Sequence, residues 1–506
     1  MAQTNYDSEF CGKVPIHLTN LIQPYGVLVV VDTTQFNVIQ VSENADKVFG
    51  HEPASILSNP LSSYIGASAF SEFRAKLGAG SNKIPAVWTI KDRQFLVLVH
   101  DKGQYLLIEI ELDPISLAKR DSFIEVYQEL KYAMLAIEST TNLQETCRHA
   151  AIELKRISGF DKVMIYKFDS DWNGFVMAEE READMESYFG FTFPASDIPK
   201  QARDLYLKNP YRLIPDKDYT PVKLHPVVNP ITRSLLDLSD CNLRSVVSVH
   251  LEYLANMGVS ASMSTRILHE EKLWGLIACH HKTPKFLSYE MCSMFEMLST
   301  IISGRLSSIH NQKALARENE IRIAYNQLIE NIYKSNNLDD VLISDKGITT
   351  VLNGSGVVIT RNGRTKSSGI TPDVAQLEEL ILWLHTRQLR KLFYTDALSQ
   401  LHDYADEYRD VASGLLVIPI NYHTDSYVLL FRAETLRSIS WGGNPDERIQ
   451  FDKDEKNYHP RNSFKQWQQK VSGVATPWTK EEISTAEALR SFILEFETYQ
   501  FPNTQT

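Results

Sequence analysis

A long helical pattern near the middle of the chain constrains its fold more than any other feature. From Met291 to about Tyr333, apolar residues recur near the spacing of a coiled coil, and polar residues fill the positions between them. The recurring residues are Leu298, Ile302, Arg305, Ile309, Ile321, Tyr325, Leu328 and Ile332. The pattern predicts a long helix that connects two domains. Ordinary core packing would produce part of this periodicity, but we favour a dimer seam along the helix.

Length and composition indicate a globular protein of several domains. The 506 residues correspond to three domains of roughly 150 residues each, and an apolar fraction of 43% lets each domain bury its own core. The net charge of −11 argues against nonspecific nucleic-acid binding, which needs a basic face. No apolar run reaches the length that spans a bilayer, and Met1 to Phe10 is polar and acidic. We therefore expect a soluble, cytoplasmic protein that does not bind DNA.

The five cysteines are scattered and form no CxxC pair, which favours a reducing compartment and free thiols over a disulfide framework. They are Cys11, Cys147, Cys241, Cys279 and Cys292. Cys279 is followed directly by His280 and His281, but no second ligand pair has a spacing that suits a metal. We expect no metal site.

Local patterns predict an N-terminal domain with a small antiparallel sheet. Gly26 to Val31 and Asn37 to Val41 are rich in β-branched residues and flank a short turn, and the helix-prone segment Ser42 to Phe49 follows them. This α+β domain is expected to end near Asp121, where helical spacing of apolar residues begins.

The second predicted domain opens with two amphipathic helices, Ile124 to Ile137 and Asn142 to Ile157. A second antiparallel sheet should follow. Its predicted strands are Val163 to Phe168, Arg244 to Leu251, Ser264 to Leu268 and Leu273 to His280.

The third predicted domain lies beyond the long helix and ends in a helix from about Ile483 to Tyr499. A long polar segment with Trp441, Trp467 and Trp478 precedes that helix. Such a segment inside a compact domain is functional or disordered, and its tryptophans argue against disorder. We interpret it as an arm that docks elsewhere. The predicted strands of this domain are Val357 to Thr360, Leu415 to Pro419 and Tyr427 to Phe431.

The segment Phe193 to Pro199 reads Phe-Pro-Ala-Ser-Asp-Ile-Pro and precedes a helix-like run. Helix capping explains it when it is taken alone, because Ser196 or Asp197 can accept hydrogen bonds from the first free amides of a helix, where a proline is also tolerated. Three further features accompany it: Cys11 upstream, and Ser248 to Tyr253 and Pro460 to Phe464 downstream. In this order the four features resemble a bacteriophytochrome, and the resemblance covers nearly the whole chain.

The resemblance implies three domains in the order PAS, GAF and PHY. The expected ranges are 1–120 for an N-terminal arm with the PAS domain, 121–310 for the chromophore-binding GAF domain, and 311–506 for the PHY domain. The PHY domain is expected to carry a projecting arm, the tongue, at about 436–480. The resemblance also implies a figure-of-eight knot, in which the N-terminal arm with Ile22 threads a loop of the GAF domain.

By the same resemblance, the cofactor is biliverdin, a linear tetrapyrrole bound as a thioether to Cys11. The prolines near Cys11 can hold that arm on a fixed path, and the thiolate is the form that would add to a vinyl group. Plant and most cyanobacterial phytochromes carry their attachment cysteine where this chain has Val249, and this departure favours attachment through Cys11. Without the other motifs, an inert terminal cysteine would be the simpler interpretation.

Asp197 and His250 are expected beside the pyrrole nitrogens, because a buried cationic chromophore needs acceptors and a protonatable neighbour. The other cofactor residues implied by the resemblance are polar partners for two propionates and groups around the terminal D ring. The propionate partners are Arg212, Arg244, Tyr206, Ser262 and Ser264. The D-ring groups are Tyr166, Tyr188, Phe193, Tyr253 and His280, and Ile198 completes the set. Any one of these residues alone would be interpreted as a core or surface residue.

The segment Pro460 to Phe464 resembles the tongue motif, which implies that Arg461 pairs with Asp197 in the dark and that Ser463 takes over the contact after illumination. The family often reads Trp-x-Glu further on, whereas this chain has Trp467 followed by two glutamines. That position therefore offers hydrogen bonding without a charge.

The resemblance implies a red/far-red photoreceptor that converts between Pr and Pfr by D-ring isomerisation and signals through tongue refolding and helix shifts. It also implies a parallel homodimer. The sequence holds no kinase or cyclase signature, so the chain is expected to be no enzyme and to act through an output module, a histidine kinase or diguanylate cyclase, or through a partner. The alternatives are a non-photochemical PAS/GAF regulator that binds a small molecule and, with less support, an enzyme that uses Asp197 with His250.

Overall fold

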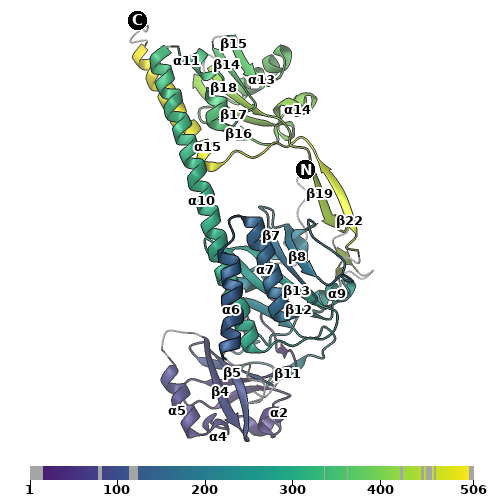
Figure 1. Cartoon of the computed structure of the whole chain (residues 1–506). Helices are drawn as coiled ribbons and strands as arrows, with labels where there is room; N and C mark the ends of the chain where they lie inside the picture. The colour runs from purple at the N-terminus through teal and green to yellow at the C-terminus, as the bar shows by residue number, and fades with distance from the viewer. Residues whose placement is uncertain are drawn as a thin grey trace. The chain divides into compact units, whose positions relative to one another are not determined.

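The computed structural model forms two compact units, one comprising Met1–Ile309 with Ser440–Trp467 and the other His310–Ile439 with Gln468–Thr506 (Figure 1). The residues that the structure describes are 15–77, 83–112, 123–335, 337–361, 363–421, 426–445, 449–451, 458–460 and 463–500. Among the described helices, none combines the length and the apolar character that crossing a bilayer would need.

The first sheet, in the first unit, has seven antiparallel strands in the order β1-β11-β3-β2-β6-β5-β4. The strands are β1 Leu21–Ile22, β2 Gly26–Asp32, β3 Val38–Ser42, β4 Lys83–Ile90, β5 Arg93–Asp101, β6 Tyr105–Glu111 and β11 Val222–His225. Its helices are α2 Asp46–Phe49, α3 Pro53–Ile56, α4 Ser62–Ile65 and α5 Ala67–Lys76. Apolar side chains of these helices and of the sheet form one core. The two predicted strands and the α+β character of this domain are confirmed.

Strand β11 comes from far along the chain and fills the edge of the first sheet between β1 and β3. Ile22 pairs with Val222 on this strand and forms a bridge with Arg244. Its side chain is fully buried in an apolar cluster with Leu224, Leu236, Leu238 and Leu243. The N-terminal arm therefore packs against two stretches of the 222–244 segment, and the expected knot through that segment stays a prediction.

The second sheet, whose strands from β10 to β9 lie in the first unit, has the order β10-β12-β13-β7-β8-β9, extended by β19 and β22. The strands are β7 Lys162–Phe168, β8 Gly174–Arg181, β9 Thr192–Phe193, β10 Tyr211–Ile214, β12 Ala261–His269, β13 Lys272–His281, β19 Arg437–Gly442 and β22 Gln466–Val471. The pairs from β10 to β9 are antiparallel, whereas β9 and β19 pair in parallel. Strands β8, β9 and β10 have no counterpart in the sequence-based prediction.

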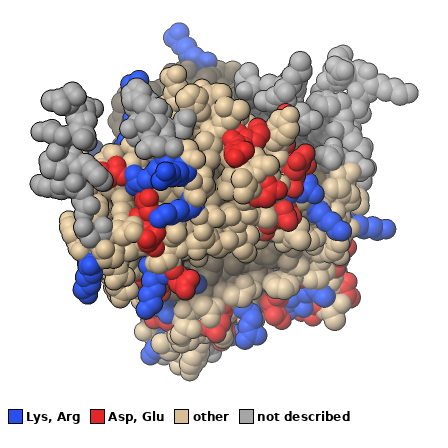
Figure 2. Space-filling view, turned by 90° about the horizontal axis from the view of Figure 1, so that it is seen from above, with Lys and Arg blue, Asp and Glu red and all other residues tan. Residues whose placement is uncertain are grey.

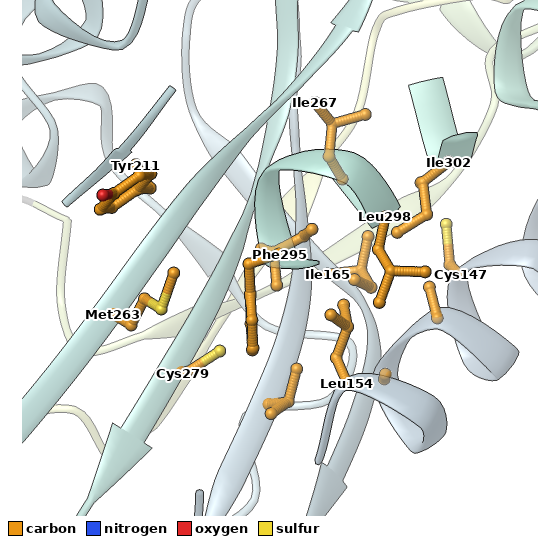
Figure 3. Packing of buried hydrophobic residues seen from close by; sticks show 14 of the residues in the cluster. Cys147, Leu154, Ile165, Tyr211, Met263, Ile267, Cys279, Phe295, Leu298 and Ile302 are labelled. Atoms are coloured by element: carbon orange, nitrogen blue, oxygen red, sulfur yellow. The ribbon is translucent and has the colours of Figure 1, made fainter. Parts of the chain in front are cut away.

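Three helices cover one face of the second sheet: α6 Phe123–Glu138, α7 Leu143–Ser158 and the first part of α10 Tyr289–Ser335. Figure 3 shows Cys147 and Leu154 of α7 close to Leu298 of α10 and Ile165 of β7 in this core. Helices α6, α7 and α10 confirm the three helices that the spacing of apolar residues predicts.

The predicted dimer seam along α10 is wrong for its apolar positions. Leu298 and Ile302 are fully buried in the core of the second sheet, and Ile321, Leu328 and Ile332 are buried in a core of the second unit. These side chains are taken up by sheet domains of their own chain, so they cannot face a partner. Ordinary core packing explains the periodicity, because a helix that covers a sheet needs an apolar stripe of similar spacing.

The predicted strand Arg244 to Leu251 is also wrong, because its second half begins the helix α9 Ser248–Asn256. Valines at 246, 247 and 249 favour extended structure locally. A strand needs a neighbour along its length, however, and Arg244 forms only an isolated bridge with Ile22. His250 and Tyr253 therefore lie on a helix.

The third sheet, in the second unit, has five antiparallel strands in the order β15-β14-β18-β17-β16. The strands are β14 Gly356–Arg361, β15 Arg364–Gly369, β16 Phe393–Thr395, β17 Gly414–Asn421 and β18 Ser426–Arg432. The helices of this unit beyond α10 are α11 Leu338–Leu342, α12 Ile348–Leu352, α13 Val374–Thr386, α14 Arg409–Ala412 and α15 Lys480–Gln500. The three predicted strands and the final helix are confirmed.

The described part of the tongue contains β19, β20 Ile449–Phe451, β21 Tyr458–Pro460 and β22. Trp441 on β19 pairs with Thr192, and Phe464 is buried in an apolar cluster of the second sheet. This segment therefore docks on the second sheet, as predicted for an arm that docks outside its own domain. Figure 2 shows Lys and Arg side chains mixed with Asp and Glu over the described residues of the face in view.

Candidate functional site

The first unit contains a cavity of about 740 Å³ on the face of the second sheet opposite the helical core. This volume falls within the range of small-molecule and cofactor sites, roughly 300–1,000 Å³. All the predicted cofactor residues that the structure describes line this one cavity: Tyr166, Tyr188, Phe193, Asp197, Ile198, Tyr206, Arg212, Arg244, His250, Tyr253, Ser262, Ser264 and His280. Cys11 lies outside the described residues.

The alternation of strand side chains explains why the sheet residues reach the cavity. Val163 and Ile165 of β7 belong to the helical core, whereas Met164 and Tyr166 between and beyond them line the cavity. On β12, Ser262 and Ser264 line the cavity in the same alternating manner. The sheet therefore has one face that is filled by helices and one that borders the cavity.

The loop before α8 Lys200–Lys208 carries Asp197 into the cavity. The side chain of Arg203 donates to the backbone oxygen of Ile198 at 2.6 Å, and Asn173 accepts a hydrogen bond from the backbone of Ala195 at 3.2 Å. The carboxylate of Asp197 accepts a hydrogen bond from the hydroxyl of Tyr253 at 2.8 Å. Pro199 is the N-cap of α8 and no side chain caps that helix, so the helix-cap interpretation of Ser196 and Asp197 is wrong.

Helix α9 contributes His250, Tyr253 and Leu254 to the cavity at helical spacing, and its C-cap residue Met257 also lines the cavity. The rings of His250 and Tyr253 stack nearly parallel, with centroids 6.1 Å apart. Burial, reinforced by the positive charge of Arg212, lowers the pKa of His250 to about 4. The imidazole is therefore neutral at neutral pH in the ligand-free protein.

Two guanidinium groups lie beside each other at the cavity wall. Arg212 donates to the backbone oxygen of Arg244 at 2.8 Å, and Arg244 donates to the backbone oxygen of Ile16 at 3.3 Å. Burial lowers the pKa of both groups, and the charge of Arg212 helps to lower that of Arg244 to about 9. Within the described residues, neither arginine forms an ion pair with a carboxylate. Arg244 is buried and Arg212 is half-buried. Positive charges in such places are costly without a counter-charge, so this wall is suited to an anionic ligand.

Several buried polar atoms of the cavity have no hydrogen-bond partner among the described residues: Arg244 Nε, His280 Nδ1 and Ser196 Oγ. Burial lowers the pKa of His280 to about 3. Tyr206 and Ser264, by contrast, share a hydrogen bond of 2.6 Å at the arginine side. Unpaired buried polar groups cost free energy, and a ligand with carboxylates and ring N–H groups would supply the missing partners. The residues therefore fit an anionic linear tetrapyrrole.

Aromatic rings close another part of the cavity. Tyr188 makes an edge contact with Phe193 at a centroid distance of 5.6 Å, and Tyr166 lies 6.1 Å from Phe193. Phe464 of the tongue packs against Tyr253 at 5.2 Å and against Tyr188 at 6.5 Å. A side chain at Gly174 would collide with the ring of Tyr166, so glycine at that position keeps the ring in place.

Sequence reasoning missed part of the lining, including Met164, Val176, Leu254, Met257 and Pro460. Helical spacing in the Ser248 to Met257 segment would have identified Leu254 and Met257 if that segment had been interpreted as a helix. Among the predicted tongue residues, Ser463 is exposed and Trp467 is half-buried, and Arg461 lies outside the described residues.

The carboxylate of Asp197 has the hydroxyl of Tyr253 as a hydrogen-bond partner. The described cysteines, Cys147, Cys241, Cys279 and Cys292, are all buried. Over the described residues, no group of three or more His, Cys, Asp or Glu side chains is arranged for a metal ion.

Comparison with protein families identifies three regions along the chain. Residues 11–113 match the PAS fold, residues 142–306 match the GAF domain, and residues 321–500 match the phytochrome region. Together they cover most of the described residues.

Two curated relatives illustrate the likeness. The chain is 36% identical to cyanobacterial phytochrome B of Nostoc over 496 residues, with 96% of this chain and 66% of that protein aligned. It is 32% identical to a bacteriophytochrome of Xanthomonas campestris, with 98% of this chain and 80% of the relative aligned. The chain thus spans about two thirds of the length of the first relative and four fifths of the second.

Two solved structures have the same fold over nearly all of this chain. A bacteriophytochrome of R. palustris aligns with a TM-score of 0.83 and 32% identity, covering 97% of this chain and 99% of the other. The photosensory core module of a Stigmatella aurantiaca phytochrome aligns with a TM-score of 0.82 at 32% identity and the same coverage. This chain therefore belongs to the bacteriophytochrome family and forms a photosensory core of PAS, GAF and PHY domains.

Proposed function

We propose that this photosensory core is a red/far-red light receptor that holds biliverdin in the 740 Å³ cavity. When bound, biliverdin would supply the absorption of red light and an isomerisation of the bond between its C and D rings. The observation that carries the proposal is the pair Arg212 and Arg244, one half-buried and one buried, which place two guanidinium groups at the cavity wall without a carboxylate partner among the described residues. A dianionic bilin suits this pair, since each arginine can hold one propionate bidentately.

Polar residues near the arginines complete the proposed propionate site. Tyr206 and Ser264 are already hydrogen-bonded to each other at 2.6 Å, and Ser262 lines the same cavity. Hydroxyl groups can donate to a carboxylate and accept from one another, so they tolerate both the occupied and the empty site.

Asp197 and His250 are proposed to contact the pyrrole nitrogens, Asp197 through its backbone oxygen and His250 through a shared water. His250 has a pKa of about 4 in the empty cavity because burial and Arg212 disfavour its charged form. A neutral imidazole can accept a hydrogen bond from a ring N–H group while the positive charge stays on the bound bilin.

Attachment is assigned to Cys11, whose thiol would add across a vinyl group of the cofactor, with the proton and the sulfur both retained in the product. Val249 lines the cavity next to His250 and offers no thiol. The described cysteines are buried, which supports Cys11 as the attachment residue.

The signalling part of the proposal rests on the tongue. Phe464 packs against Tyr253 and Tyr188, so a change in these rings on illumination would reach the tongue directly. Arg461 is proposed to pair with Asp197 in the dark, Ser463 to replace it after illumination, and Trp467 to take part in the change from hairpin to helix. The proposed domain ranges are 1–120, 121–310 and 311–506, with the tongue at about 436–480.

A parallel homodimer is proposed with α6 in the interface. Helix α6 exposes Tyr127, Tyr132 and Leu135, each more than half accessible, and Met297 of α10 is half accessible. Large exposed apolar side chains on one helix suit a contact between copies. An output module or a downstream partner would receive the signal.

The test is the absorption spectrum of the purified chain with biliverdin, in darkness and after alternating red and far-red light. Reversible exchange between two bands is expected, and the band found in darkness identifies the stable state. C11A should abolish the mass increase of the denatured chain, whereas C147A, which removes a buried thiol, should retain it. A spectrum identical to free biliverdin would contradict the proposal and favour a PAS/GAF regulator that binds another small molecule.

A further inference from the structure

Lys162, on β7, is a buried lysine outside the cavity that the proposed function does not use. Lys162 is only 1% exposed. Such burial is rare for lysine, because burying a charge without partners is costly. Burial lowers the pKa of Lys162 to about 8, although Glu179 and Glu186 favour its charged form. A buried lysine that keeps carboxylate neighbours indicates a specific role for its charge.

The ammonium group of Lys162 has three partners on one side of the sheet. It donates to the backbone oxygen of Glu186 at 2.6 Å and lies 3.7 Å from the carboxylate of Glu179. It also lies 3.8 Å from the centroid of the Tyr188 ring, a distance suited to a cation–π interaction. The lysine therefore contacts the segment Glu186 to Tyr188 through both its backbone and its aromatic ring.

Glu179, on the neighbouring strand β8, holds the same segment from its own side. Its carboxylate accepts from the backbone N–H of Tyr188 at 2.9 Å and from the hydroxyl of Ser187 at 2.6 Å. Its side chain is 3% exposed, and Arg181 lies 3.4 Å from its second oxygen. Lys162 and Glu179 thus form a buried charge pair whose remaining contacts converge on Tyr188.

Tyr188 connects this pair with the cavity and the tongue. Its ring lines the cavity and packs against Phe193 at 5.6 Å and against Phe464 at 6.5 Å. Lys162 also acts on His280 across the sheet, because after burial its charge is the largest cause of the lowered pKa of His280. The same buried ammonium therefore contacts the Tyr188 ring and adds to the effect of burial on His280.

We propose that Lys162, together with Glu179, is a positioning residue that holds the Tyr188 ring in place at the cavity wall, and so tunes the absorption and the photoconversion of the bound bilin. The role in photoconversion rests on the proposed function. The role in holding Tyr188 does not depend on it, because every contact that carries it is present without a ligand.

The experiment compares K162M, K162R and E179Q with K167M as the matched control. Lys167 lies on the same strand and over an aromatic ring, that of Trp274 at 5.7 Å, but Trp274 belongs to the helical core and not to the cavity. Fluorine NMR of the ligand-free, fluorotyrosine-labelled chain, with Tyr188 assigned through Y188F, reports the ring directly. The same variants loaded with biliverdin report the absorption maximum and the yield of photoconversion.

We expect K162M to shift and broaden the Tyr188 resonance in the ligand-free chain, and to shift the absorption maximum and lower the photoconversion yield of the loaded chain. K162R keeps the positive charge, so its Tyr188 resonance, absorption maximum and photoconversion yield should stay close to those of the wild type. K167M should change none of the three. E179Q should act in the same direction as K162M but less, because the amide keeps an acceptor for Tyr188. E179Q also tests the proposal if K162M does not fold.

An unchanged Tyr188 resonance in both K162M and E179Q would overturn the proposal, and so would equal effects of K162M and K167M. If the wild-type chain fails to photoconvert while K162M still shifts the Tyr188 resonance, the proposed function fails and the positioning contact stands. If the wild-type chain photoconverts and the variants leave the resonance and the spectrum unchanged, the proposed function stands and the role of Lys162 is rejected.

Discussion

The second and third sheets are built alike but treat their two faces differently. In the third sheet, Val357 and Ile359 of β14 enter a core with α10 and α15, and Val358 between them enters a second core with α13. In the second sheet, Ile165 enters a helical core, whereas Met164 beside it faces the cavity. When both faces of a sheet are covered, its side chains contribute to the cores and leave no room for a ligand. A sheet that leaves one face open, and lines it with unpaired polar groups, is shaped for a ligand.

The largest expected effect tests the closed sheet. Leu429 and Leu430 are neighbours on β18, both fully buried, and they enter the two different cores of the third sheet. L429A and L430A should each lower the free energy of unfolding of this unit by roughly 2–5 kcal/mol, because each leaves a cavity in a packed core. Hydrogen exchange of the β18 amides, resolved by peptide, measures both. Normal protection in one of the two variants would contradict the picture of two closed faces.

The matched pair in the open sheet should behave unequally in the ligand-free chain. I165A, in the helical core, should lower the free energy of unfolding by roughly 2–5 kcal/mol. M164A should lower the free energy of unfolding by about 1 kcal/mol, because Met164 borders an existing cavity and its truncation removes fewer contacts. Hydrogen exchange of the β7 amides gives both values. Equal costs would mean that the cavity face is packed like a core when the ligand is absent.

Removing one buried arginine should separate ligand binding from folding. R244M should weaken biliverdin binding about 10- to 100-fold, because hydrogen bonds to charged groups contribute about 1.5–3 kcal/mol. Its stability without ligand should be unchanged or higher, since a buried charge without a carboxylate partner is replaced by an apolar chain of similar length. Spectroscopic titration gives the affinity, and R156M, at an exposed site on α7, controls for the lost charge. Equal affinities of R244M and the wild type would contradict the anion site.

The last expected effect is a pH dependence of the stability of the ligand-free chain. The pKa of His250 is lowered to about 4 and that of His280 to about 3 by burial. Between these values and about 6.5, the ordinary pKa of histidine, the unfolded chain binds more protons than the folded one, so stability falls as the pH falls through this window. Urea unfolding at about pH 7 and about pH 5 should show this loss, and H250Q should reduce it. A loss of the same size in H250Q would show that other groups cause it.

Much of the candidate site could be predicted because four short features resemble those of bacteriophytochromes, and the resemblance implies the remaining cofactor residues. Alternation along β7, β12 and β13 gave the correct strands, and the motif residues Asp197, Arg212 and His280 all reach the cavity. The helix α9 was missed because its valines favour a strand locally, whereas only the surrounding fold shows that no neighbouring strand is available. Leu254, Met257 and Pro460 were missed for a related reason, since each enters the cavity from an element whose place depends on distant contacts.

The sequence by itself determined the extent of α10 and eight of the nine strands predicted from it, because periodicity depends on neighbours along the chain. The set of residues that share one cavity came from the resemblance of its short motifs to a known family. Only the tertiary structure decided that β11 joins the first sheet, that the apolar stripe of α10 is buried in its own domains, and that Lys162 contacts the ring of Tyr188. The physical reason is that burial and pairing of backbone groups are settled between segments far apart in sequence, where local propensity is too weak to choose among partners.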